Sequence, residues 1–235
     1  MEYAPITTNV FFFVDQSLKK SFSKQRASKF VEYANGVLLN SCISLHRELI
    51  SFEYVNFDLS DEEFLDEIHS QVVKSIGRQR ILNIRENSTD FYVVVLPDDN
   101  PYFYDDTIGV TDWELSESFI LLSDKASIDT LEHEFGHLMW ANHVEKNWFN
   151  PLQRELEMSL NHNDRHLVKP YARGYLCSNA GTIMSYEKLV LPVYSNPDVY
   201  YRGVACGDVE RGNNNRRVEE YVKELRQKLK NSGMN

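Results

Sequence analysis

The chain has 235 residues, which is enough for one sizeable domain or for two lobes that share a cleft. Its 25 Lys and Arg residues against 35 Asp and Glu residues give a formal net charge of −10. This acidic balance disfavours nucleic acid as a partner, because phosphate binding depends on clusters of basic side chains. The sequence contains no run of about 18 apolar residues, so we expect no membrane span.

Two features bear on the compartment. The first residues have neither the basic flank nor the apolar stretch of a signal peptide, which leaves a cytosolic protein, export by another route, or a leader already removed. The three cysteines, Cys42, Cys177 and Cys206, allow at most one disulfide and one free thiol. We expect Cys42, at the end of an amphipathic helix, to be a buried thiol.

The N-terminal part alternates between strand and helix patterns. Residues 9–15 form a short, almost wholly apolar run that is typical of a buried strand, and residues 27–38 carry apolar side chains at helical spacing. Residues 50–54 alternate apolar and polar side chains, as in a half-buried strand. Ser60 and Glu63 then form a capping box that opens a helix. The predicted inner face of that helix carries Phe64, Ile68, Val72 and Ile76.

The middle of the chain predicts further strands. Residues 91–96 read as a fully buried strand that is central in its sheet, and residues 97–106 as an acidic, aromatic loop. Residues 108–113 and 118–123 predict two more strands. Strands that alternate with helices favour a mixed α/β sheet.

The amino-acid composition and the periodicity of the sequence change near residue 143. Asn, Gly, Pro and Tyr become frequent and the periodicity fades, until apolar spacing over residues 218–229 predicts a final helix. We therefore expect a single domain over residues 1–235, with an ordered N-terminal lobe (1–143) and an irregular C-terminal lobe (144–235) that ends in a helix.

A metal-binding pattern lies at that junction, in a segment whose spacing is helical. His133 and His137 are one turn apart, so both imidazoles project from one face of a helix and can share one ion. Glu134, one step around the helix, is placed to reach a metal-bound water. Asp129 can cap this helix with Glu132 three residues on. The predicted core stripe of the helix consists of Leu131, Phe135 and Leu138.

His143 supplies a third ligand if the chain turns back. A continuous helix would carry His143 about 9 Å along the axis from His137, at 1.5 Å per residue. The helix must therefore end near Trp140 or Asn142, and Asn142 is a residue type that tolerates the left-handed conformation of such a turn. With His133-Glu134 given, two further histidines at these offsets arise by chance roughly once in a thousand.

Four alternatives compete with this three-histidine zinc site. The first is a charged helix whose histidines are satisfied by ordinary hydrogen bonds. The second is a zinc peptidase of the gluzincin kind, with Glu157 or Glu155 as the third ligand. The third is a catalytically silent binding protein, which the intact Glu134 disfavours. The fourth is a nucleic-acid-binding zinc protein, which the net charge and the lack of a Cys-rich ligand set disfavour.

A second motif, Gly181-Thr182-Ile183-Met184-Ser185-Tyr186, completes a resemblance. Together with His133, Glu134, His137 and His143 it resembles the metzincin metallopeptidases, whose pattern His-Glu-x-x-His-x-x-Gly-x-x-His is followed by a tight turn centred on Met. Residues 172–186 and 194–207 are similar to secreted bacterial peptidases of the reprolysin-like and peptidyl-Asp metalloendopeptidase type. Trp140 departs from the pattern, since it stands where the family has Gly. Either Asn142 takes over the turn or the helix runs longer.

The resemblance implies a zinc endopeptidase with one catalytic ion, a protein or peptide substrate, and a monomeric state. In the family the Met, here Met184, forms a floor under the zinc site. Tyr186 matches a position that in some members contacts zinc or the oxyanion. An edge strand (Gly109, Val110 and Thr111) would pair with an extended substrate. These are the site residues that we expect from the resemblance.

Further expectations follow from the same resemblance. The segment 187–194 would line the pocket for the first residue beyond the cut, where Lys188 or Arg202 could select acidic side chains. Cys177 and Cys206 flank the Met-turn and could be bridged, which would indicate an oxidising compartment and a secreted or exported protein.

The remaining polar clusters are explained without a specific function. An acidic loop could hold calcium, although a solvated loop is the more common outcome. The histidines outside the motif lack ligand spacing, and we expect them to be surface or capping residues. The acidic residues are Asp98, Asp99, Asp105 and Asp106, and the histidines are His46, His69, His162 and His166.

Overall fold

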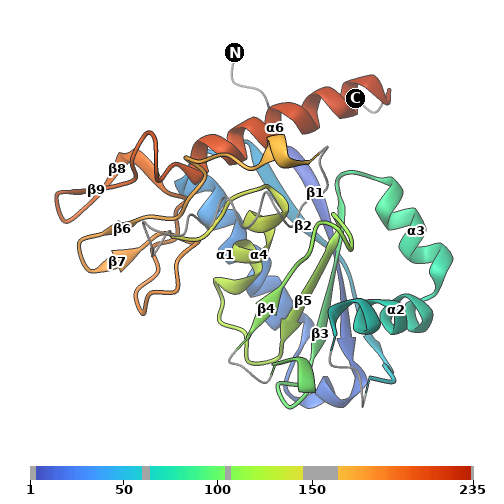
Figure 1. Ribbon diagram of the computed structural model, residues 1–235. Helices are drawn as coiled ribbons and strands as arrows, with labels where there is room; N and C mark the ends of the chain where they lie inside the picture. Colours follow the sequence, from blue (N-terminus) through green and yellow to red (C-terminus); the bar gives the residue numbers. More distant parts are fainter. Residues whose placement is uncertain (1–3, 60–63, 104–106, 145–163, 234–235) are drawn as a thin grey trace. The chain divides into compact units, whose positions relative to one another are not determined.

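The computed structural model describes residues 4–59, 64–103, 107–144 and 164–233 (Figure 1). Several predicted features lie outside these ranges. They are the Ser60–Glu63 capping box, Asp105 and Asp106, Glu155 and Glu157, and His162. None of the helices within the described ranges is both long and apolar enough to cross a membrane.

The chain divides into two compact units. The sheet unit comprises residues 7–34 and 46–134, and the C-terminal unit comprises residues 1–6, 35–45 and 135–235. The division falls inside two helices, α1 (Lys24–Asn40) and α4 (Thr130–Leu138), each of which runs through it.

A five-stranded mixed sheet forms the sheet unit, in the order β2-β1-β3-β5-β4 (Figure 1). Its parallel centre consists of β1 (Ile6–Asp15), β3 (Asp90–Leu96) and β5 (Phe119–Ser123). The edges are β2 (Leu45–Val55) and β4 (Gly109–Val110), and β4 is antiparallel to β5. The prediction of a mixed sheet with β3 at its centre is confirmed. Side chains on both faces of β3 are buried, which explains its unbroken apolar run.

Helices cover both faces of the sheet. α2 (Leu65–Ile76) and α3 (Arg78–Glu86) pack Ile68, Val72, Ile81 and Ile84 on the face that carries Phe13, Tyr92 and Phe119 (Figure 1). On the other face Phe12 stacks on Phe22, which in turn stacks on Phe30 of α1. Two short 3-10 helices, Gln16–Lys20 and Pro101–Phe103, follow β1 and β3.

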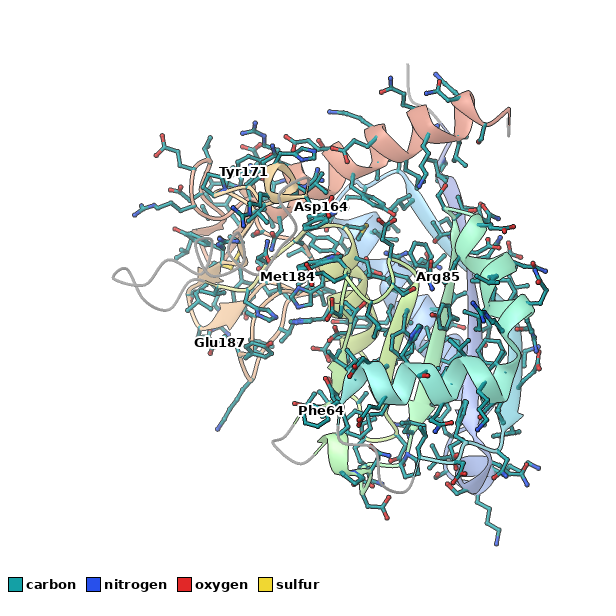
Figure 2. All side chains as sticks on the ribbon, turned by 45° about the vertical axis from the view of Figure 1, so that its right-hand side comes forward. Phe64, Arg85, Asp164, Tyr171, Met184 and Glu187 are labelled. Atoms are coloured by element: carbon teal, nitrogen blue, oxygen red, sulfur yellow. A yellow bond between two sulfur atoms is a disulfide. The ribbon has the colours of Figure 1, made fainter. Side chains whose placement is uncertain are left out.

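Three predictions in the sheet unit are wrong. Phe64 is 64% exposed, because it precedes α2 as its N-cap residue instead of lying on the inner face (Figure 2). His69 is buried against Tyr92 rather than at the surface. The strand predicted over residues 108–113 is limited to Gly109–Val110. It ends there because Asp112 accepts hydrogen bonds from the backbone of Glu114 and Ser116, which form a turn.

The described residues of the C-terminal unit form two hairpins and a long helix. Strands β6 (Leu176–Cys177) and β7 (Ala180–Gly181) pair, as do β8 (Asn196–Tyr201) and β9 (Val204–Cys206), and the Cys177–Cys206 disulfide joins the hairpins. A short 3-10 helix, Arg165–Leu167, precedes them. The predicted final helix is α6 (Asn214–Asn231), whose inner face carries Val218, Val222 and Leu225.

Cys42 is exposed, so its prediction as a buried thiol is wrong. It has a φ of 55° and lies two residues after Asn40, the last residue of α1. Its N–H bonds to the Leu39 carbonyl, and the next N–H, of Ile43, bonds to the Leu38 carbonyl, which is the Schellman pattern of a helix end. The left-handed residue of such an end lies outside the helix, where its side chain reaches solvent.

Candidate metal centre

Helix α4 presents His133, Glu134 and His137 within one turn. It is fixed to the sheet by a buried ion pair between Arg47 of β2 and Glu132, with Nε–Oε2 at 2.6 Å and Nη2–Oε1 at 3.0 Å. Arg47 is 2% and Glu132 0% exposed. The carboxylate of Glu132, which the sequence places in the first turn of α4, thus accepts from Arg47 across the two elements. This two-point contact lies one residue before His133 and limits rotation of the helix.

The chain reverses after α4 in a second Schellman turn. The Ala141 N–H bonds to the Gly136 carbonyl at 2.9 Å and the Trp140 N–H bonds to the His137 carbonyl at 2.8 Å. Trp140 adopts a φ of 66°, whereas Asn142 has no positive φ. The early end of the helix is confirmed, but the prediction that Asn142 takes the left-handed position is wrong. Trp140 occupies the position that Gly usually fills in this motif.

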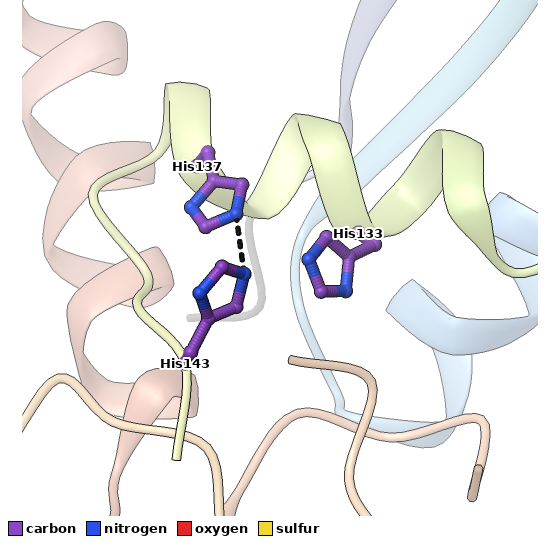
Figure 3. Close-up of side chains that lie close together, drawn as sticks. All are labelled: His133, His137 and His143. Atoms are coloured by element: carbon purple, nitrogen blue, oxygen red, sulfur yellow. Dashed lines mark hydrogen bonds between the residues drawn. The ribbon is translucent and has the colours of Figure 1, made fainter. Parts of the chain in front are cut away.

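The reversal brings His143 to His137. Their Nε2 atoms are 2.9 Å apart, as the dashed line in Figure 3 shows. On the other side of its ring, His137 Nδ1 lies 3.2 Å from the Ala141 carbonyl. A carbonyl only accepts, so Nδ1 carries the proton and the Nε2 lone pair faces His143. The Trp140 turn thus also sets the tautomer of His137.

The donor atoms of His133, His137 and His143 all lie within 4.8 Å of one another. Tetrahedral zinc with bonds of about 2.0–2.1 Å would need ligand nitrogens roughly 3.4 Å apart. Within the described residues this is the one cluster of three or more potential ligands. Three neutral imidazoles are a known zinc donor set, so these residues fit the ion. Asp98 and Asp99 of the acidic loop are exposed and belong to no such cluster.

Glu134 is buried, and this burial raises the pKa of its carboxyl to about 8. Its carboxylate lies against β4, since a Cβ built on Gly109 would be 3.0 Å from Glu134 Oε1 and 2.5 Å from Thr130 Cγ2. Only a residue without a side chain allows α4 to approach β4 this closely. Beyond Gly109 and Val110, Thr111 has left the strand, and its hydroxyl donates to the Phe119 carbonyl at 2.5 Å.

Met184 is fully buried in the C-terminal unit (Figure 2). A Cβ built on Gly136 of α4 would lie 2.4 Å from Met184 Sδ, so the thioether packs directly on the helix backbone. A Cβ on Gly174 would lie 2.6 Å from the Met184 carbonyl oxygen, which places a second chain segment against the same residue.

Tyr186 lies beside the third histidine. Its hydroxyl is 2.8 Å from His143 Nε2 and the two rings are 4.5 Å apart, although the tyrosine is 66% exposed. Lys188 and Arg202 are both exposed, and Arg202 donates to Asn179. The structure therefore brings Tyr186 to the histidines and leaves the two basic residues at the surface.

Sequence reasoning missed two residues that hold the site. Arg47 lies at the start of a half-buried strand, where a basic residue normally faces solvent. Asn214 is in a run of three asparagines that indicates only a helix start, yet its side chain bonds to the backbone of Asn142. Both partners are distant in sequence, so no local pattern could have found them.

The fold and the three histidines define a mixed α/β protein with a site suited to zinc. No protein-family model matches the sequence, and no curated protein matches it either.

Several solved structures resemble the fold. A chain of a chaperone–substrate complex aligns with a TM-score of 0.67 and 14% identity, over 95% of this chain and 35% of that chain. The crystal structure of metalloproteinase-II from Bacteroides fragilis aligns with a TM-score of 0.50 and 15% identity, over 95% of this chain and 55% of that chain. This chain thus spans about a third and about half of their lengths, and at these identities the likeness concerns the fold.

Proposed function

We propose that this chain is a zinc-dependent endopeptidase of the metzincin type, similar to the reprolysin-like and peptidyl-Asp bacterial enzymes. His133, His137 and His143 hold one zinc ion, and Glu134 is the general base. The observation that carries the proposal is the convergence of three imidazoles beside a buried glutamate that shares helix α4 with two of them. A structural zinc site needs four protein ligands and no base, whereas a catalytic site keeps a position open.

When bound, zinc supplies Lewis acidity, which polarises the scissile carbonyl and acidifies water. Glu134 takes a proton from the attacking water and then returns it to the leaving amine. In the metal-free protein burial raises the pKa of the Glu134 carboxyl to about 8, and a carboxylate in such surroundings accepts a proton more readily than one in water. The Tyr186 hydroxyl, 2.8 Å from His143 Nε2, donates a hydrogen bond to the carbonyl oxygen as charge develops on it.

The substrate binds as an extended peptide along β4. Gly109 and Val110 form the sheet edge next to Glu134, so a peptide added there by β-augmentation runs past the base. Thr111, which directly follows β4, also contacts the peptide. Met184 forms the floor of the metal site through its contact with Gly136. The whole of residues 1–235 acts as a single catalytic domain and as a monomer.

We further propose that the protein works outside the cytosol. The Cys177–Cys206 disulfide is consistent with an oxidising compartment, since cytosolic thiols are kept reduced.

Cleavage of unfolded casein tests the activity, and a zinc chelator should abolish that cleavage. Glu134→Gln should retain zinc and lose hydrolysis, while His143→Ala should bind zinc weakly. Glu157→Ala should leave zinc binding unchanged, and a large loss in that variant would instead support the gluzincin ligand set. Zinc-loaded wild type that cleaves neither casein nor a proteome-derived peptide library would favour the silent binding protein.

A further inference from the structure

The backbone directly before His143 is paired with one side chain. The Asn142 N–H donates to Asn214 Oδ1 at 3.2 Å, and Asn214 Nδ2 donates to the Asn142 carbonyl at 2.9 Å. Both residues are buried and both belong to the C-terminal unit. An N–H can only donate and a carbonyl can only accept, so the amide has one productive orientation. The side chain thus acts as a neighbouring β-strand would.

Asn214 is itself held in place. It begins α6, and its N–H donates to Ser195 Oγ at 2.8 Å. The Ser195 hydroxyl donates in turn to the Arg173 carbonyl at 2.5 Å. The Gly174 N–H, in the same peptide unit as the Arg173 carbonyl, donates to the Asn142 carbonyl at 2.7 Å. This bond completes a closed ring of hydrogen bonds. A buried polar network whose members are all paired is rigid.

We propose that Asn214 is a positioning residue for the metal centre and that it acts through His143. The inference rests on the proposed function, because it takes the three histidines as zinc ligands. His133 and His137 are placed by α4, whereas His143 lies in a connection without regular structure. Asn214 fixes the peptide units on either side of Asn142 and thereby the backbone from which His143 projects. Groups that orient zinc ligands in this way typically contribute about 10–100-fold in metal affinity.

The test measures zinc affinity by competition with a chromophoric chelator. Asn214→Ala should weaken zinc binding by at least about tenfold. Asn213→Ala is the matched control, because Asn213 caps the same helix by accepting from the Arg216 N–H and does not bond to Asn142. It should destabilise α6 and leave zinc affinity unchanged. If Asn214→Ala does not fold, Asn214→Asp decides, since it keeps the shape and the acceptor but loses the donor to the Asn142 carbonyl.

Two further readouts separate positioning from general destabilisation. The visible spectrum of the cobalt-substituted protein should change in the Asn214 variants and not in Asn213→Ala. In a His143→Ala background, Asn214→Ala should have no additional effect on affinity, because its effect passes through that ligand. Equal zinc affinities and cobalt spectra for the Asn214 and Asn213 variants would overturn the inference about Asn214 but not the proposed function. Wild-type protein that binds no zinc would overturn the proposed function as well.

Discussion

The thioether of Met184 packs on the backbone of Gly136, the residue that precedes His137 on α4, so closely that a Cβ there would lie 2.4 Å from Sδ. Helix α4 and Met184 are therefore fitted to each other at a position where a side chain is not tolerated. A second nearby contact would also tighten, since the same Cβ would lie 3.3 Å from Tyr194 Cε1.

Gly136→Ala should therefore lower the free energy of unfolding by about 1–3 kcal/mol, as overpacking does. It should also weaken zinc binding, because Met184 and α4 must separate. The matched control is Gly36→Ala in α1, where a Cβ meets nothing within 4 Å. That change should stabilise the protein by up to about 1 kcal/mol through helix propensity. Urea denaturation measures both, and a stabilised Gly136→Ala would contradict the packing.

The sequence predicted the relative positions of those candidate site residues that lie on a single helix. The spacing of His133, Glu134 and His137 fixes their common face, because a helix of 3.6 residues per turn leaves no choice. It also required the chain to reverse before His143. The residue that makes the reversal was mispredicted, because intrinsic preference favours Asn over Trp in the left-handed region. Tertiary burial of Trp140, which is 9% exposed, outweighs that preference.

The left-handed conformation of Trp140 gives a comparison of two substitutions. Trp140→Ala and Trp140→Gly lose the same buried indole, but only alanine retains a Cβ at a φ of 66°. Trp140→Gly should therefore be the more stable variant by about 1–2 kcal/mol. In an ordinary helical position the order is reversed, by up to about 1 kcal/mol. Chemical denaturation of the two variants decides, and an alanine variant at least as stable as the glycine variant would rule out the left-handed turn.

Some parts of the fold that the sequence did not reveal depend on pairs of distant residues. Arg47 and Glu132 are 85 positions apart, and each alone reads as a surface charge. The strand over residues 108–113 was predicted too long, because alternation does not register the turn that Asp112 makes. Local sequence patterns therefore predicted most strands and helices, including α4. The contacts that fix α4 in place could be found only in the structure.

The Arg47–Glu132 pair predicts unequal effects of single and double substitutions. Arg47→Met leaves a buried carboxylate without its cation, and Glu132→Leu leaves the guanidinium without its anion. Each should lower the free energy of unfolding by about 3–5 kcal/mol. The double variant should cost much less than the sum, since paired apolar residues leave no uncompensated charge. A double-mutant cycle by denaturation measures the coupling, and additive losses would show that the two charges do not stabilise each other.

His69 provides a pH-dependent test of the sheet unit. Its Nε2 lies 2.6 Å from the Tyr92 hydroxyl in the core, and Tyr92 in turn donates to Ser116. Burial, and then the positive charge of Arg85, lower the pKa of His69 from 6.5 to about 4. The unfolded chain therefore binds a proton on this residue below about pH 6.5, whereas the folded chain does not until about pH 4.

Metal-free protein should accordingly lose stability as the pH falls from about 6.5 to 4, by roughly 3 kcal/mol from this residue, because its pKa is lowered by about 2.5 units and each unit is worth about 1.4 kcal/mol. His69→Gln keeps a hydrogen-bonding group for Tyr92 and cannot titrate, so its free energy of unfolding should fall less over that interval. His46→Gln is the control, because His46 is exposed. Urea denaturation at half-unit pH steps measures the three profiles. Parallel profiles for wild type and His69→Gln would show that His69 binds protons equally in the folded and unfolded states. That result would contradict the prediction that burial lowers its pKa.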